Sequence, residues 1–389
     1  MNTEDLKKFW EVKDNGFLPS REGAYDLLCQ SPYDVFTKQI PDFIDSGTIR
    51  NEVVNYLNNK ETQDIIDDDL RDINKNAYLD GEYTVDRAES LMRFMSYIAS
   101  AYVHVPGQPV INILPKEIAK PFVAISKIVE RPPILSYASY CLYNWHRMYK
   151  KPVELGYISL VQNFCSYKQA KRDEDWFILV HVEIEAKAAK GIEVIANLKK
   201  YQQDVDCMKD GLQKMLESLV QMSIALKRMP EQCSPDVYYA KVRPYIFSFE
   251  NMVYEGEFNN IPQTFRGETG AQSSIVPAFQ IALGVQHKES LLTTHLKDMR
   301  NYMPLAHREF LTNLEQQTTI RDFILNNQDN GLKHLYNACV SQLYEFRRQH
   351  LAYAVEYIQN KVPNPKGTGG TPYVPWLSQL AKETESYYL

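Results

Sequence analysis

The sequence predicts an all-α protein, and three observations support that prediction. Apolar residues recur at helical spacing along most of the 389 residues. No series of short alternating strands appears, so a large sheet is not expected, although the pattern leaves room for a small hairpin near the N-terminus. Only 16 residues are glycine, which is below the roughly 7% of ordinary globular proteins and disfavours both a turn-rich β-sandwich and a glycine-fingerprint dinucleotide fold.

The expected helices follow from this periodicity in chain order. The first spans 85–105, with Asp86 as its N-cap and Glu89 as the capping-box partner. A loop follows at 105–110, prolines interrupt the next segment, and helical character returns at 134–145. Later amphipathic stretches predict helices over 175–201, 205–229, 274–285, 291–303, 306–314 and 331–360.

Two further segments bear on organisation. The composition changes near 150–156 (KKPVELG), so we expect a small, mostly helical N-terminal domain over 1–152 and a large all-helical domain over 153–389. The polar stretch 254–273 reads as a long loop, and such loops in compact domains are more often functional than idle.

Charge and targeting signals exclude several classes of protein. The 43 Lys and Arg residues against 49 Asp and Glu give a net charge of −6, which does not suit nucleic-acid binding. The charged N-terminus is no secretory signal, and no apolar run is long enough to span a membrane. The six cysteines show no metal-binding spacing, so we expect reduced thiols in a cytoplasmic protein.

His350 is the most informative residue of the last long helix. It belongs to one helix face formed by Leu335, Cys339, Leu343, Phe346, His350, Ala354 and Tyr357. Arg347 lies one turn before it on nearly the same side. Two interpretations stand at this point. His350 is either a core histidine bonded to a neighbour, or the iron ligand of a haem whose propionate pairs with Arg347.

His181 has the same character on another helix. It lies on the stripe Phe177, His181, Ile184, Ala188, Ile192 and Ile195. An inward histidine is by itself more often structural than catalytic, but two of them on two helices could share a cofactor pocket. The other six histidines show no such pairing, and the KGTGGT segment at 366–371 lacks the spacing of a phosphate-binding loop.

Nine short segments, in order, resemble one family. They are FMSYIASAYV from Phe94, LPKEIAKPF from Leu114, RPPILSYASYCLYNW from Arg131, VRPY around Arg243, VYEGEF from Val253, GAQSS from Gly270, LKDMRNYMPLAHREFL from Leu296, FRRQHL from Phe346 and KGTGGT from Lys366. Together they are spread, in order, over about three-quarters of the chain and resemble the indoleamine 2,3-dioxygenases, which open the indole ring of tryptophan.

The resemblance implies a fold and a cofactor. A smaller helical domain would pack on a larger one, with haem b between them. FRRQHL would make His350 the proximal iron ligand and place Arg347 near a haem propionate. Because no second strong ligand is implied, the iron would keep an open site for dioxygen.

The resemblance also implies the substrate pocket. Tyr137 and Tyr140 would line the indole site, with Tyr140 in place of a cysteine of the mammalian-type enzymes. Phe177 would pack on the indole ring, and Tyr238 replaces a pocket phenylalanine. The remaining pocket residues would be Arg243 for the substrate carboxylate, Ile246 as an apolar wall, Thr269 and Gly270 at the haem edge, and Thr371 over the ammonium group. Without the resemblance, Arg243 would read as a surface arginine before a proline.

His181 is the main departure from the family pattern. The mammalian-type enzymes have serine there, whereas the related tryptophan 2,3-dioxygenases have histidine. A neutral imidazole can accept a hydrogen bond from the indole N–H and fix the ring's orientation. Catalytic roles are therefore expected for His181 and Arg243.

The expected function is cleavage of the pyrrole ring of L-tryptophan or a related indole by dioxygen, giving an N-formylkynurenine-type product. One alternative is a haem enzyme of secondary metabolism that rearranges a substituted tryptophan; the substitutions at Tyr140 and Tyr238 leave room for it. The other is a non-catalytic haem- or indole-binding protein.

Overall fold

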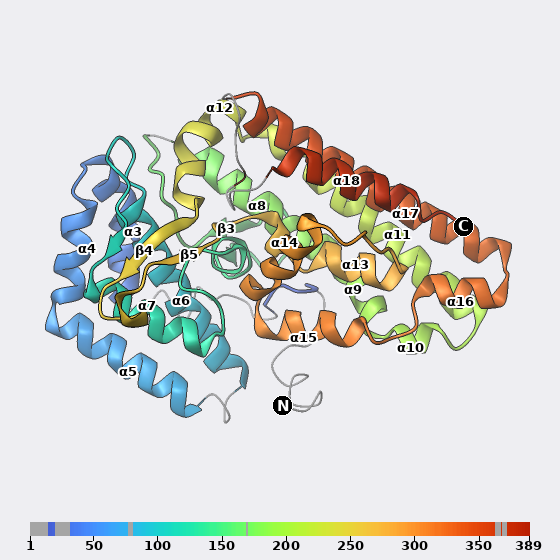
Figure 1. Cartoon of the computed structure of the whole chain (residues 1–389), viewed down its shortest axis with the longest axis horizontal. Helices are drawn as coiled ribbons and strands as arrows, with labels where there is room; N and C mark the ends of the chain where they lie inside the picture. Colours follow the sequence, from blue (N-terminus) through green and yellow to red (C-terminus); the bar gives the residue numbers. More distant parts are fainter. Residues whose placement is uncertain (1–14, 20–31, 77–80, 169, 362–366, 368–371) are drawn as a thin grey trace.

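The fold is mostly helical, as the sequence predicts. The computed structural model describes residues 15–19, 32–76, 81–168, 170–361, 367 and 372–389. Figure 1 shows helices on every side and only short strands between them. Among the described residues no helix is long and apolar enough to cross a membrane. The boundary expected between residues 152 and 153 stays a prediction.

The N-terminal helices form one side of the molecule (Figure 1, blue to teal). They are α3 (Pro32–Asp45), α4 (Ile49–Asn58), α5 (Lys60–Asn76), α6 (Gly81–Val103) and α7 (Lys116–Ile128). Helix α6 contacts the other four, and its stretch 88–101 is buried throughout. This burial explains why 85–105 shows such clear helical periodicity in the sequence.

The start of α6 differs from the prediction. The helix begins at Gly81, so Asp86 lies inside it and the predicted capping box with Glu89 is wrong. Both oxygens of Glu89 instead accept hydrogen bonds from the buried guanidinium of Arg131. A bidentate partner of this kind is what lets a carboxylate remain buried.

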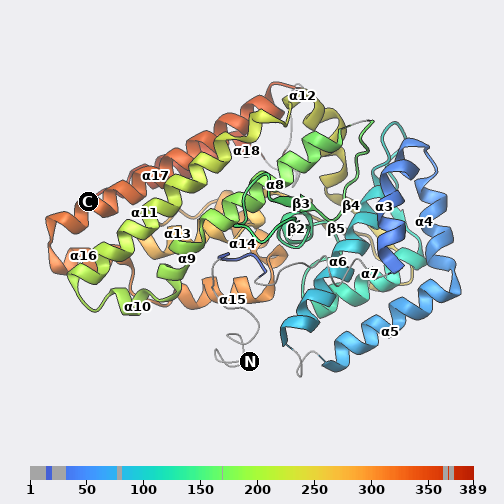
Figure 2. The same cartoon turned by 180° about the vertical axis from the view of Figure 1, so that it is seen from behind.

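The remaining helices form the other side of the molecule. The 175–201 stretch is divided into α8 (Lys171–Lys187), α9 (Ala189–Ala196) and α10 (Leu198–Tyr201). Then come α11 (Val205–Lys227), α12 (Pro235–Val237), α13 (Ile275–Leu283), α14 (Leu291–Met299), α15 (Leu305–Leu314), α16 (Ile320–Asn327), α17 (Asn330–Ala354) and α18 (Tyr373–Glu385). Helices α11 and α17 pack side by side, and α18 returns along α17, as Figure 2 also shows from behind.

The strands are short and form two small sheets. Strands β1 (Ile113–Leu114), β4 (Phe249–Tyr254) and β5 (Gln263–Phe265) make one sheet, in which β1 is parallel and β5 antiparallel to β4. Strands β2 (Trp145–Arg147) and β3 (Ile158–Leu160) form an antiparallel pair. The expectation of no large sheet is confirmed, and every described strand lies after residue 112.

Single helical turns join several of these elements. The predicted helix over 134–145 is only the π-helical turn η1 (Ala138–Leu142) followed by β2. The others are η2 (Met229–Glu231), η3 (Tyr238–Val242), η4 (Arg243–Ile246), η5 (Phe258–Asn260), η6 (Gly270–Gln272), η7 (Arg300–Tyr302) and η8 (Val355–Gln359). The predicted 254–273 loop thus contains η5, β5 and η6.

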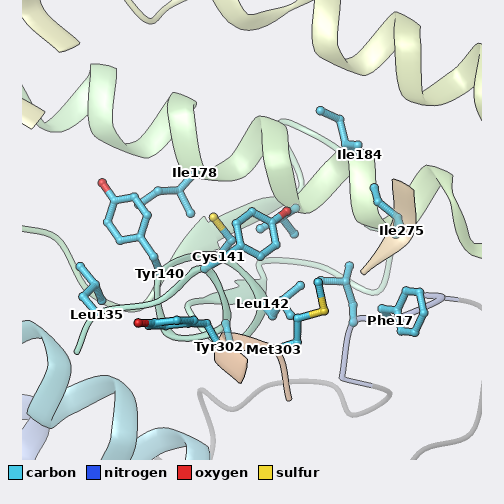
Figure 3. Packing of buried hydrophobic residues seen from close by; sticks show 14 of the residues in the cluster. Phe17, Leu135, Tyr140, Cys141, Leu142, Ile178, Ile184, Ile275, Tyr302 and Met303 are labelled. Carbon is cyan, nitrogen blue, oxygen red and sulfur yellow. The ribbon is translucent and has the colours of Figure 1, made fainter. Parts of the chain in front are cut away.

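The core runs between α8 and η1. Figure 3 shows Tyr140 and Cys141 of η1 below helix α8, with Ile178 and Ile184 projecting from that helix. All four side chains are at most 4% exposed. This packing fixes the turn η1 against α8, and both elements contribute to the site.

Candidate functional site

An interior cavity of about 310 Å³ lies between α8, α13, α14, α17 and α18. Most of its lining is apolar, from residues such as Ile184, Val276 and Phe346. Its polar groups include three histidines, His181, His295 and His350, and the segment 269–273 supplies several of the other lining residues. A mostly apolar cavity with a few convergent polar groups is the usual form of a cofactor or ligand site.

His350 faces this cavity from α17. Its neighbours on the predicted stripe, Phe346 and Ala354, are buried, whereas the His350 side chain is exposed because it borders the cavity. Although its side chain borders the cavity, the surrounding protein keeps His350 away from bulk water, and this desolvation lowers its pKa to about 4. The nearby His181 and Arg347 lower the pKa further. The imidazole makes no hydrogen bond with another described residue, so a neutral ring with available lone pairs faces the cavity.

His181 faces the same cavity from α8. Its Nδ1 lies 2.7 Å from the carbonyl oxygen of Phe177. Since a carbonyl can only accept, Nδ1 carries the proton and Nε2 keeps its lone pair. Burial lowers the pKa of His181 below its ordinary value, which favours this neutral form.

The aromatic residues expected at the indole site form one cluster beside His181. The Phe177 ring lies 4.7 Å from His181, 4.6 Å from Tyr238 and 6.4 Å from Tyr140. Tyr140 and Tyr238 are buried and do not line the cavity, whereas Tyr137 does. The structure therefore brings the predicted aromatics together, but it places three of them, Phe177, Tyr140 and Tyr238, behind the cavity wall.

Arg243 and Ile246 lie in η4, next to the cavity rather than in its lining. Both are at most 2% exposed, and the Arg243 guanidinium lies 4.7 Å from the Phe247 ring. Arg243 also lowers the pKa of the cavity-lining Tyr373, although burial raises that pKa by more. The alternative interpretation of Arg243 as a surface arginine before a proline is thus wrong, and Arg243 is an interior cation near the cavity.

The polar segment after β5 forms one edge of the cavity. Thr269 and Gly270 both line it, and the Thr269 hydroxyl accepts the backbone N–H of Ala271. Just before them, Gly267 packs on the backbone of Ile246, so that an added Cβ would collide with it. Thr371 lies outside the described residues.

Arg347 lines the cavity but is already bonded within the protein. It donates to Gln280 Oε1, Leu380 O and Thr384 Oγ1 at 2.7–2.9 Å, and to His287 Nε2 at 3.0 Å. These bonds tie α17 to α13 and α18. Burial lowers the pKa of Arg347 to about 10, so the guanidinium stays charged at neutral pH.

Sequence reasoning missed several cavity residues. His295 of α14 lies 5.2 Å from the Trp376 ring of α18, and both line the cavity with Arg300 and Gln280. The sequence held one usable signal, since Arg300 lies within the family-like LKDMRNYMP segment and His295 directly precedes it. Nothing in the periodicity of 373–385 placed α18 against α14.

The fold and the cavity define a class of protein. It is a helical protein that can hold a flat, largely apolar cofactor through one neutral histidine. The family model described as indoleamine 2,3-dioxygenase matches residues 5–365. The chain therefore belongs to the indoleamine 2,3-dioxygenase family, whose enzymes depend on haem.

Curated relatives agree with this assignment. Indoleamine 2,3-dioxygenase 1 of Mus musculus is 30% identical, over 92% of this chain and 89% of its own length. Indoleamine 2,3-dioxygenase of Saccharomyces cerevisiae is 27% identical, over 97% of this chain and 92% of its own. A protein named myoglobin from Haliotis diversicolor is also 27% identical, over 98% of both chains.

Proposed function

We propose that this protein is a haem-dependent dioxygenase that opens the indole ring of L-tryptophan or a related indoleamine. The observation that carries the proposal is the pair His181 and His350. Both are held neutral by burial and both line one cavity. One offers a lone pair to a metal, and the other offers a lone pair to a substrate N–H.

The residues present fit haem. His350 would ligate the iron, because its ring is neutral and has no protein hydrogen bond among the described residues. The apolar lining suits the porphyrin, and Arg347 and Arg300 are the arginines that line the described part of the cavity. We propose that the haem carboxylates pair with these arginines. When bound, the haem iron supplies the activation of dioxygen.

The chain's own groups would bind and orient the indole. His181 Nε2 would accept the indole N–H. The Phe177 ring lies 4.7 Å from the His181 ring but outside the cavity lining, so its expected packing on the indole would need the substrate to reach past that lining. Arg243, buried next to Tyr373, supplies a fixed charge for the substrate carboxylate. Thr269 and Gly270 close the cavity edge, and Thr371 would act at the ammonium group.

Several of the expected pocket residues limit how far the cavity extends into the protein. Tyr140, Tyr238 and Ile246 are buried and, like Phe177 and Arg243, are not among the described lining residues, whereas Tyr137 lines the cavity itself. In this proposal the protein supplies the positioning of the substrate, and the haem supplies the redox chemistry.

The test is product analysis with the haem-loaded protein. Reduced protein, L-tryptophan and dioxygen should give N-formylkynurenine, identified by its mass, in stoichiometric relation to oxygen consumed. Good binding of L-tryptophan without this product, but with a rearranged one, would favour the secondary-metabolism alternative.

A second candidate function rests on the relative named myoglobin. A protein that only binds dioxygen would form a stable oxygenated spectrum and give no product from any indole tested. The same experiment therefore separates the two.

Two further expectations belong to the proposal as well, a cytoplasmic location and a division into two domains. A cytoplasmic location is supported by the five described cysteines, which are all free thiols, four of them buried. The division into a small and a large helical domain at residues 152 and 153 is supported by the grouping of α3–α7 on one side in Figure 1.

A further inference from the structure

Glu185 is a buried carboxyl group that the proposed reaction does not use. It lies on α8, one turn after His181, and is 0% exposed. Taking a carboxyl group out of water is costly unless hydrogen bonds compensate for the loss. The bonds that Glu185 makes therefore indicate why it is present.

Both of these bonds go to residues of the cavity lining. Glu185 Oε1 accepts the hydroxyl of Tyr137 at 2.9 Å and the hydroxyl of Ser273 at 2.6 Å. Tyr137 directly precedes η1, and Ser273 directly follows η6. A single oxygen on α8 thus joins three segments of the cavity wall that are far apart in the sequence.

Neighbouring hydrogen bonds leave Tyr137 little freedom. Its backbone N–H donates to Gln272 Oε1 at 2.8 Å, so the 269–273 segment holds Tyr137 at its main chain as well as through Glu185. The Tyr137 ring stands edge-on to the His181 ring, with centroids 6.0 Å apart and planes at 76°. The position of Tyr137 therefore limits the position of the His181 imidazole.

The influence of Glu185 is local. Its other oxygen, Oε2, is buried and has no hydrogen-bond partner in the part of the chain that the structure describes. Burial raises the pKa of Glu185 to about 7, although the two hydroxyl donors act to lower it. The side chain thus has no described polar partner other than Tyr137 and Ser273.

We propose that Glu185 is a positioning residue, which acts through Tyr137 and Ser273 to fix the wall that carries His181 and so to set where the substrate's indole N–H lies. The inference rests on the proposed function and goes beyond it by assigning a role to a residue that touches neither substrate nor cofactor. A merely structural carboxyl group would affect all ligands equally, whereas a positioning group should affect the ligand that uses His181.

The test is the ratio of two dissociation constants, for L-tryptophan and 1-methyl-L-tryptophan, from spectral titration of the haem-loaded ferric protein. Glu185→Leu removes the acceptor, and the preference for L-tryptophan should fall about tenfold, the size of one lost charge-assisted bond. Glu185→Gln keeps a carbonyl oxygen at the same place and should stay within about twofold of the wild type.

A coupling experiment tests the route of the effect. In a protein that already carries Tyr137→Phe and Ser273→Ala, Glu185 has no described donor left to hold. Adding Glu185→Leu to that background should change the preference by less than about twofold, because residues that act together are not additive. A full tenfold loss in that background would overturn the proposal.

Glu183→Leu is the matched control. Glu183 is also buried on α8, but it pairs with Arg228 and Lys187 and does not line the cavity. This variant should keep the wild-type preference with equal haem content. An unchanged ratio in Glu185→Leu, or an equal loss for both ligands, would refute the role of Glu185. A wild-type protein with no preference at all would instead refute the proposed role of His181.

Discussion

Replacement of His181 by alanine should remove most of the protein's preference for a free indole N–H. The structure fixes what is lost. Nδ1 is tied to the Phe177 carbonyl, so the only group that His181 presents to the cavity is the Nε2 lone pair. A substrate N–H buried at that position without its acceptor is an unsatisfied donor.

The expected loss of affinity follows from the cost of leaving that N–H donor unpaired. An unpaired buried donor costs about 1–3 kcal/mol, which is about 5-fold to 150-fold in affinity. In wild-type protein 1-methyl-L-tryptophan has no N–H to donate, so it leaves the Nε2 acceptor of His181 unpaired and also brings a methyl group toward that atom. In His181→Ala the penalty falls on L-tryptophan, so the two dissociation constants should converge.

The assay is spectral titration of the haem-loaded protein with both ligands, in parallel with steady-state kinetics. His181→Gln is the informative companion, because its amide oxygen can accept the same bond and should restore part of the preference. Since burial holds the pKa of His181 below its ordinary value of 6.5, protonation of His181 itself should add no pH dependence to the wild-type affinity between pH 8 and pH 6.5. If His181→Ala keeps the full preference, the indole N–H does not bind His181 and the reasoning is wrong.

Three further outcomes are expected. His350→Ala should lose the Soret band of bound haem or shift it strongly; a normal ferric and ferrous spectrum would refute the ligand assignment. Gly267→Ala should lower the free energy of unfolding by about 1–3 kcal/mol in guanidinium titration, because its Cβ meets the Ile246 backbone; an unchanged value would show that the segment can shift. The free energy of unfolding should also fall between pH 6.5 and 8.5, on the order of 3 kcal/mol. Over that range buried carboxyl groups must ionise in the folded state but are already ionised when unfolded, and the histidines with lowered pKa values contribute only below about pH 6.5. The pKa is raised from 4.5 to about 7, 7 and 8 at Glu174, Glu185 and Glu268. A rise in stability with pH would contradict this account.

The helices that the sequence predicted best are those with one strongly apolar face. Helix α11 begins at the expected residue, and α17 begins one residue before its expected start. The break between α8 and α9 was missed because Ala188 is a good helix former and no proline or glycine marks the change of direction. Helix α7 was missed for the opposite reason, since Pro121 reads as an interruption but lies inside the helix.

The site was predictable where one helix face carried it. His350 and His181 could be placed by their spacing, since residues three and four apart share a face. The bond from Tyr137 to Glu185 joins residues 48 positions apart, and the bonds of Arg347 to Leu380 and Thr384 depend on where α18 docks. No local pattern encodes such contacts, because they arise only when the segments pack.

A histidine at position 181 limits the hydrogen bonds that this wall of the cavity can make. A serine hydroxyl can both donate and accept a hydrogen bond, whereas a neutral His181 whose Nδ1–H is held by Phe177 can only accept at the cavity. The ring contacts with Phe177 and Tyr137 oppose the rotation that would expose Nδ1 instead. His181 can therefore orient an indole through its N–H, but it cannot deliver a proton to the reacting atoms while it stays neutral. Under the proposed function, His181 would therefore contribute to ring opening by orienting the substrate and not by acid catalysis.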